Sequence, residues 1–194
     1  MKPFEAIENE LIDRRSGWWE RIVITVPELA VLASTKQPPA YHAEGDVAQH
    51  TRRAVEACSP GCDPDLLWAA LLHDIGKPAV TQDEDSRITA RGHHTIGAGM
   101  TDKILQGLGM PPERSERIVW AVKNHLFHLS WHLRTPEQAS PRHRRFIADS
   151  RFPLLLELLR VDSIASEGNP RGMESYNLYK TLFEKIIASD QGTA

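Results

Sequence analysis

Cysteine is scarce in this sequence, which limits the kinds of metal site that it can form. The 194 residues include only two cysteines, Cys58 and Cys62, separated by Ser-Pro-Gly. A four-cysteine zinc site needs a second pair of cysteines, which the chain lacks. Half of a zinc site is one interpretation of the pair, and two reduced cysteines in a turn are the expected one.

Long apolar runs are absent as well. No run in the sequence approaches the roughly 20 residues that a membrane-spanning helix needs, and charged residues occur throughout. The first residues, Met-Lys-Pro-Phe-Glu, lack the features of a signal peptide. We therefore predict a cytoplasmic protein with no membrane partner.

A strong charge of one sign is also missing, because the formal net charge is -3 at pH 7. This value gives no reason to expect strong nonspecific binding to nucleic acid. A nucleic acid is therefore not the expected partner, although local basic patches remain an option. Histidine, in contrast, is abundant, with nine residues against three tyrosines.

The spacing of apolar residues is helical nearly everywhere, and no β-type alternation of useful length occurs. Residues 21–26 are rich in β-branched side chains and are locally ambiguous. The length suits one domain with a full core. We predict a single all-α domain, with a mobile polar loop at 81–92 and helices at 3–24 (broken at Gly17), 27–33, 45–57, 63–74, 94–108, 112–128, 136–149, 153–166 and 173–189.

One apolar, helix-favouring run ends in adjacent polar residues, His73 and Asp74, and Gly76 and Pro78 follow at once. Glycine and proline end a helix, so the pair should lie near its open end. A buried, unpaired carboxylate is costly, and a bound metal ion is a common compensation. The dipeptide alone is a weak signal, so further ligands must come from other helices.

Two other residues could supply these ligands. His50 lies near the middle of a predicted helix, and Asp162 lies within the strongly apolar run 153–165. A lone carboxylate in such a helix has a large desolvation cost, unless it caps a neighbouring backbone. Together His50, His73, Asp74 and Asp162 offer two nitrogens and two carboxylates, an open octahedral set that suits Mn, Fe, Co or Ni better than Mg.

These residues, in this order and set in helices, resemble the HD-domain metal-dependent phosphohydrolases. Four stretches carry the resemblance: 41–51, leading into His50; His-Asp-Ile-Gly-Lys at 73–77; Gly-His-His-Thr-Ile-Gly-Ala at 92–98; and Val-Lys-Asn-His-Leu at 122–126. The resemblance covers residues 28–168, leaving an N-terminal helical extension, 1–27, and a C-terminal helix, 169–194.

Within this superfamily the chain looks most like the HD domain of bacterial tRNA nucleotidyltransferases, in which a polymerase head lies upstream. Because His50 comes only 49 residues from the start, we expect a freestanding HD protein and do not assume that tRNA is its substrate.

The resemblance implies that His93 and His125 hold a second ion or contact phosphate. We favour His93 over His94 because it directly follows Gly92. His94 stands where the family often has a carboxylate. If one continuous helix carries His125, His128 and His132, they share a face and could extend the rim of the site, although surface histidines are the commoner explanation.

Two basic residues are candidates for contact with a substrate phosphate. Lys77 follows the His-Asp pair and could neutralise a phosphoryl oxygen. The run 141–146 contains three arginines that fan out on a helix, so we expect one, Arg145, to point at the site. The alternative for this run is a solvated basic face.

The function implied is hydrolysis of a phosphate ester by water activated on one or two divalent ions, with Asp74 or Asp162 also orienting the water. The expected substrate is a small nucleotide, cleaved as by a 2',3'-cyclic phosphodiesterase or a phosphatase. A 5'-nucleotidase acting on deoxyribonucleoside monophosphates is the nearest alternative. A metal-stabilised binding or regulatory module with little turnover is a further one.

Overall fold

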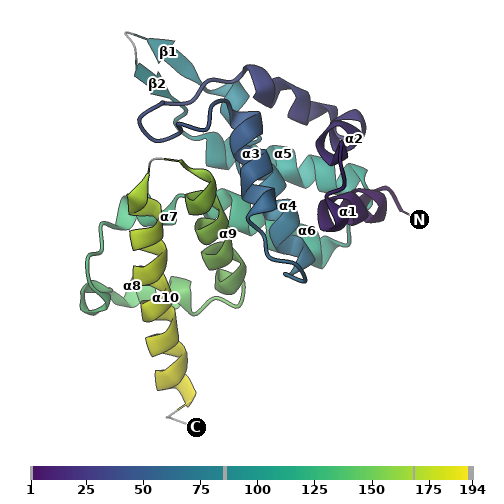
Figure 1. Cartoon of the computed structure of the whole chain (residues 1–194). Helices are drawn as coiled ribbons and strands as arrows, with labels where there is room; N and C mark the ends of the chain where they lie inside the picture. Colours follow the sequence, from purple (N-terminus) through teal and green to yellow (C-terminus); the bar gives the residue numbers. More distant parts are fainter. Residues whose placement is uncertain (1, 85–86, 168, 192–194) are drawn as a thin grey trace.

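The computed structural model describes residues 2–84, 87–167 and 169–191, and this part of the chain is mostly helical (Figure 1). The α-helices are α1 Pro3–Asp13, α2 Trp18–Thr25, α3 Val47–Glu56, α4 Pro64–Leu72, α5 His93–Gly107, α6 Pro112–Asn124, α7 Phe127–Trp131, α8 Pro141–Ile147, α9 Phe152–Ala165 and α10 Pro170–Gln191. Short 3-10 helices are η1 Pro27–Ser34, η2 Lys77–Ala79 and η3 Pro136–Gln138, and the strands are β1 Gln82–Glu84 and β2 Arg87–Thr89.

Local capping explains where the helices that carry the site begin. The Asp46 side chain caps α3 by accepting a hydrogen bond from the Gln49 backbone N–H at 2.9 Å. Asp63 caps α4 by accepting from the Asp65 N–H at 2.9 Å, with Pro64 in the first turn. The sequence prediction of an all-α fold with helices at these places is confirmed.

Helix α9 is central because it buries apolar side chains on two faces. One face packs into the core shared with α1 to α6, and the other into a second core with α7, α8 and α10. A helix that is apolar nearly all round is a buried helix. Figure 1 shows α7 to α10 gathered at one end of the molecule, with α10 extending beyond it. The residues in the two cores are Leu154, Leu158, Val161 and Ala165, and Phe152, Leu155, Leu156 and Leu159.

The structure corrects several expected elements. The predicted loop at 81–92 contains an antiparallel ribbon in which Gln82 pairs with Thr89 and Asp83 with Ile88; Asp85 and Ser86, between the strands, lie outside the described residues. The helix predicted at 136–149 is two elements, η3 and α8, because Ser140 caps a new helix that begins at Pro141. The predicted helix at 27–33 is the 3-10 helix η1, whereas the ambiguous 21–26 stretch forms most of α2.

The prediction of one continuous helix over residues 112–128 is also wrong. Helix α6 ends at Asn124, with His125 as its C-cap, and α7 begins at Phe127. Nδ1 of His125 donates to the carbonyl of Val122 at 2.7 Å. Helix α6 therefore ends at His125, whose ring is buried in the interior of the protein.

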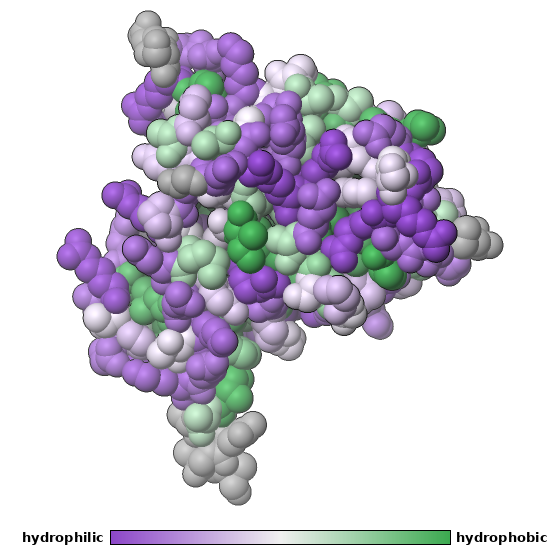
Figure 2. Space-filling model, in the orientation of Figure 1, coloured by the Kyte–Doolittle hydropathy of each residue, from purple (hydrophilic) through white to green (hydrophobic). Residues whose placement is uncertain are grey.

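The face of the molecule seen in Figure 2 is mainly hydrophilic, and its apolar side chains form small, separate patches. Among the described helices, none is both long enough and apolar enough to cross a membrane.

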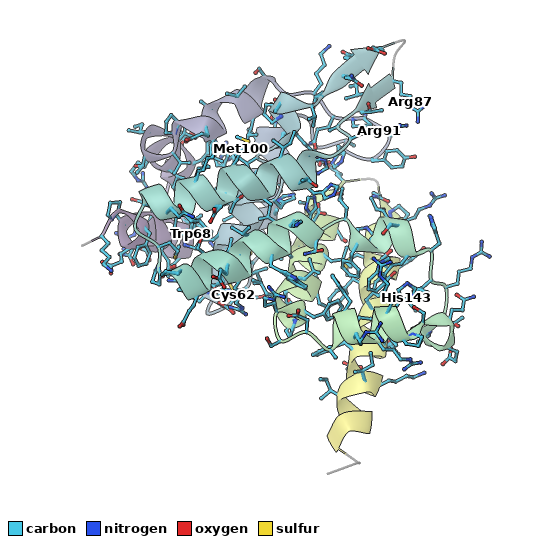
Figure 3. All side chains as sticks on the ribbon, turned by 180° about the vertical axis from the view of Figure 1, so that it is seen from behind. Cys62, Trp68, Arg87, Arg91, Met100 and His143 are labelled. Carbon is cyan, nitrogen blue, oxygen red and sulfur yellow. The ribbon has the colours of Figure 1, made fainter. Side chains whose placement is uncertain are left out.

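Both cysteines are free thiols, as expected. Cys58 is buried just after α3, and burial raises the pKa of its thiol to about 12. Cys62 is partly exposed, two residues before α4 (Figure 3). The candidate metal-binding groups among the described residues do not include either cysteine.

Cys58 should therefore be unreactive in the folded protein. Since the thiolate is the nucleophile, its fraction at pH 8 is about 10⁻⁴ for a thiol with this pKa. In the unfolded chain a thiol ionises near pH ~8.5, so above that pH the unfolded state loses a proton that the folded state keeps. Ionisation of Cys58 therefore lowers the free energy of unfolding as the pH rises from about 8.5 to about 12. Ellman titration of a Cys62→Ser variant should show labelling only at the rate of unfolding, and labelling at the rate of a free thiol would contradict the burial.

Gly76 allows the turn after the His-Asp pair to pack directly on the start of α5. A Cβ at Gly76 would overlap the carbonyl oxygen of His93 and lie 2.5 Å from the backbone nitrogen of Gly97. These are backbone atoms, so they cannot move aside cheaply.

We expect Gly76→Ala to lower the free energy of unfolding by about 1–3 kcal/mol through overpacking. The matched control is Gly99→Ala on α5, where nothing lies within 4 Å of the added Cβ, and which should raise stability by up to about 1 kcal/mol. Urea denaturation of both variants checks this. Equal stability of the two would show that the close approach at Gly76 has no energetic consequence.

Candidate metal centre

Four side chains from three parts of the chain meet at one point. Nε2 of His50, on α3, lies 3.2 Å from Nε2 of His73, which follows α4, and 3.0 Å from Oδ1 of Asp162 on α9. Oδ2 of Asp74 lies 3.2 Å from Nε2 of His73 and 3.7 Å from Nε2 of His50. The structure therefore brings together all four residues that the sequence proposed as ligands.

A second group of atoms adjoins the first and shares Asp74 with it. The other oxygen of Asp74, Oδ1, lies 3.2 Å from Nε2 of His93 at the start of α5 and 3.8 Å from Nε2 of His125. The two ring nitrogens are 3.1 Å apart. Each oxygen of Asp74 thus faces a different pair of histidines. His93 is 6% exposed and points inward, as expected, whereas the next residue, His94, is only partly buried.

The hydrogen bonds of the four histidines turn the same nitrogen toward the cluster. Each ring directs Nδ1–H at an acceptor, so that Nε2 is the atom that faces the other cluster residues. The acceptors are Glu44 Oε1 for His50 at 2.8 Å, and the carbonyls of Ala70 for His73 at 2.9 Å, Ala90 for His93 at 2.7 Å and Val122 for His125 at 2.7 Å.

Glu44 is the functional residue that sequence reasoning missed. It is buried, and the same oxygen that accepts from His50 also lies 2.8 Å from Nδ1 of His42. Its other oxygen accepts the backbone N–H of Glu167 at 3.0 Å, which ties the segment before α3 to the end of α9. A buried carboxylate behind a ligand histidine is typical of metal sites. A glutamate two residues before a capping aspartate was the available signal.

The electrostatics favour charged carboxylates. Burial alone would raise the pKa of Glu44, but hydrogen bonds from His50 and His42 lower it to about 2. Burial opposes ionisation of Asp74 too, yet His73 and Lys77 hold its pKa well below the usual range.

The histidines of the two groups differ. Burial would lower the pKa of His50, but its bonds to Asp162 and Glu44 raise it to about 9. Burial and the neighbouring charge of His73 lower the pKa of His125 to about 3, so its ring is neutral near pH 7.

The donor set fits divalent ions. Oδ2 of Asp74 is buried and receives no well-directed hydrogen bond from the described residues, although Nζ of Lys77 lies 2.6 Å away. Nε2 atoms lie 3.2 Å apart in the pair His50 and His73 and 3.1 Å apart in the pair His93 and His125, and a cation bound between them would replace any proton there. Imidazole and carboxylate ligands suit Mn, Fe, Co, Ni or Zn, and carboxylates alone are more typical of Mg.

The basic candidates lie in different places. Lys77, 9% exposed, donates to Oε1 of Gln37 at 2.6 Å and contacts Asp74 as described, so it belongs to the cluster. Arg145 is exposed on α8, and no ion pair or hydrogen bond to the described cluster residues involves it. Arg142 borders a cavity beside His94 instead. The expectation that Arg145 is the inward arginine is therefore not met.

The end of α6 before His125 places His128 and His132 on a different element, so the three histidines do not share one helix face. His128 lies on α7 and is partly buried. His132 follows the end of α7, is exposed and takes a left-handed backbone conformation. They therefore do not continue the helix of His125. His143 stacks on Trp131 with ring centroids 4.4 Å apart; Figure 3 shows it on α8, at the end formed by α7 to α10.

This fold and site define the class of protein. The HD domain family model matches residues 46–153, more than half of the chain. The match includes five of the six cluster residues and ends before Asp162. The chain belongs to the HD domain family.

Curated relatives point to one branch of the family. The chain is 31% identical over 173 residues to the A-adding tRNA nucleotidyltransferase of Deinococcus radiodurans, covering 86% of this chain and 38% of that protein. It is 30% identical over 180 residues to the CC-adding tRNA nucleotidyltransferase of Thermus thermophilus, covering 86% and 40%. The multifunctional CCA protein of Alkalilimnicola ehrlichii matches over 102 residues at 32% identity. The chain spans about two fifths of the length of the first two relatives.

Glu44→Gln should weaken metal binding about 10- to 100-fold, because it removes the charge that orients His50 and keeps its Nε2 basic. Titration calorimetry with Mn²⁺ on protein stripped with chelator measures the affinity. The matched control is Glu56→Gln, exposed at the end of α3, the helix that carries His50, which should bind as the wild type does. Unchanged affinity in Glu44→Gln would remove Glu44 from the site.

Proposed function

We propose that this HD domain is a metal-dependent phosphohydrolase that cleaves phosphate esters of nucleotides. The single observation that carries the proposal is the placement of Asp74, whose two oxygens each face a pair of histidine Nε2 atoms. His50, His73, Asp74 and Asp162 would hold one divalent ion, and Asp74, His93 and His125 a second. Bound ions of this kind lower the pKa of water and polarise a phosphoryl oxygen.

The residues of the chain have separate tasks in this reaction. Glu44 holds the proton of His50 on Nδ1, and the carbonyl of Val122 does the same for His125, which keeps both Nε2 atoms available. The Asp162 side chain is 19% exposed, more than that of Asp74 at 3%, so it lies nearer to incoming water and can accept its proton.

Lys77 contributes positive charge next to the carboxylates. Its ammonium group is fixed by Gln37 and Asp74 and has little freedom to leave. A fixed cation offsets negative charge that develops on a phosphoryl oxygen without a reorganisation cost during the reaction.

The nucleotide character of the substrate rests on the relatives, which are named as tRNA nucleotidyltransferases and CCA proteins. Opening of 2',3'-cyclic nucleotides or release of terminal phosphate is the preferred reaction. Hydrolysis of deoxyribonucleoside 5'-monophosphates is the second candidate. A regulatory module that binds metal without turnover is the alternative of another class.

A substrate panel separates these functions. Protein loaded with Mn²⁺, Co²⁺, Ni²⁺ or Mg²⁺ should hydrolyse p-nitrophenyl phosphate or 2',3'-cyclic nucleotides, and excess chelator should abolish the activity. Asp74→Asn should lower kcat by about 10²- to 10⁴-fold, whereas Asp83→Asn, exposed on β1, should keep it. Metal binding with no hydrolysis of any panel member would favour the regulatory module.

A further inference from the structure

Two cavities open beside the metal cluster, on either side of α7. The first, called here the α8 cavity, has a volume of about 480 Å³ and is bordered by His94, Lys123, Trp131 and Arg142. The second, called the α10 cavity, consists of adjoining hollows of about 350 and 730 Å³. Both hollows of the α10 cavity are bordered by His128, Leu129, Arg171 and Ser175.

Each cavity lies near one side of the cluster, although no cluster residue is on either border. The α8 cavity is next to the second pair of histidines, since the ring of His94 is 6.5 Å from that of His125, centroid to centroid. The α10 cavity is next to the first pair, because its border includes His42, whose ring centroid lies 4.9 Å from that of His50. One histidine on each border is thus a direct neighbour of a cluster histidine.

Helix α7 separates the cavities and has one residue in common to both. His128 and His132, four positions apart, border the α10 cavity, whereas Phe127 and Trp131, also four apart, border the α8 cavity. Phe127 and Trp131 share one side of α7 because of this spacing, whereas His132 lies just beyond the end of the helix. Leu129 borders every one of these hollows and is 58% exposed. A ligand that crosses α7 at Leu129 would enter both cavities.

Unpaired cations line both cavities although the chain has a net charge of -3. Lys123 and Arg142 border the α8 cavity, and Arg134 and Arg171 border the α10 cavity. None of the four has an ion pair with a carboxylate in the described part of the chain, and Glu174 is the one acidic residue on the two borders. By contrast, arginines on α6 are engaged with carboxylates of Glu8, Asp63 and Asp65.

An exposed aromatic ring borders the α10 cavity, namely Tyr41, which is 51% exposed. Trp131 borders the α8 cavity, where it already stacks on His143. Backbone-tracking cations combined with aromatic rings that stack on bases are typical of sites for single-stranded nucleic acid. A single mononucleotide would fill one cavity, since each has the size of a small-molecule pocket.

We propose that the substrate is a short single-stranded nucleic acid, whose reacting phosphodiester lies at the cluster and whose flanking nucleotides occupy the α8 and α10 cavities. This rests on the proposed hydrolase function and specifies its substrate. In the reaction one P–O ester bond breaks, water supplies hydroxide to phosphorus, and its proton goes to the leaving sugar oxygen, so no further reactant is needed. The local charge thereby overrides the expectation, drawn from the net charge, of no nucleic-acid partner.

The test uses one cation from each cavity. Arg142→Gln and Arg171→Gln are compared on 5'-labelled hexanucleotides, with RNA and DNA of one base sequence as separate arms. Each variant should raise KM for the hexanucleotide about 3- to 10-fold and lower the salt dependence of binding by about one phosphate contact. The ratio of hexanucleotide to p-nitrophenyl phosphate activity should fall accordingly, and the double variant should combine both effects.

Arg144→Gln on α8 and Lys180→Gln on α10 are the matched controls, since both residues are exposed and border neither cavity. They should behave as the wild type. Cleavage of RNA, DNA or both supports the proposal and identifies the sugar. An effect confined to one arginine, or none, would overturn it in favour of a substrate that fills one cavity.

Binding measured by fluorescence anisotropy distinguishes the two levels of failure. Arginine-dependent binding of the hexanucleotide without cleavage of any ester would refute the hydrolase and retain the nucleic-acid site. Hydrolysis of p-nitrophenyl phosphate without hexanucleotide binding would retain the hydrolase and refute the two-cavity substrate.

Discussion

The burial of the Asp74 carboxylate is the constraint on which the rest of this structure depends. A charged carboxylate that is 2% exposed is stable only where opposite charge or hydrogen bonds replace water. Here four histidine rings and Lys77 surround it, and every ring turns its Nε2 atom toward the cluster. The same arrangement that makes the apolar interior tolerate this charge makes a donor set for divalent ions.

The fold serves this cluster by bringing distant segments to one point. Helix α9 can carry Asp162 into the interior because it buries apolar side chains on both faces and so belongs to both cores. Gly76 lets the turn after Asp74 contact α5 closely enough for His93 to share that carboxylate. The end of α6 at His125 completes the second group and starts α7, the short helix that divides the two cavities. Helix α10 borders one cavity, so the C-terminal helix is part of the site region.

Much of this could be predicted from the sequence, because burying His or Asp in an apolar helix leaves a visible pattern. His73, Asp74 and Asp162 interrupt apolar stretches, His50 lies on a predicted helix, and the structure places all four together. Glu44 escaped prediction because it lies in an irregular polar segment, where a glutamate carries no such signal. Arg145 was preferred over Arg142 because helical spacing says which residues share a face but not which face meets a cavity. The separation of α7 from α6 depends on a side-chain contact of His125 that composition does not reveal.

The number of divalent ions bound per chain tests the central claim most directly. Protein stripped with chelator, reloaded with Mn²⁺ and desalted, can be measured by inductively coupled plasma mass spectrometry against protein concentration. We predict two ions per chain, falling to one in His125→Ala and staying at two in His132→Ala, whose side chain is exposed after α7. A folded protein that retains no ion, or a His125→Ala variant that binds as many as the wild type, would contradict the assignment of Asp74 as the residue shared by two metal sites.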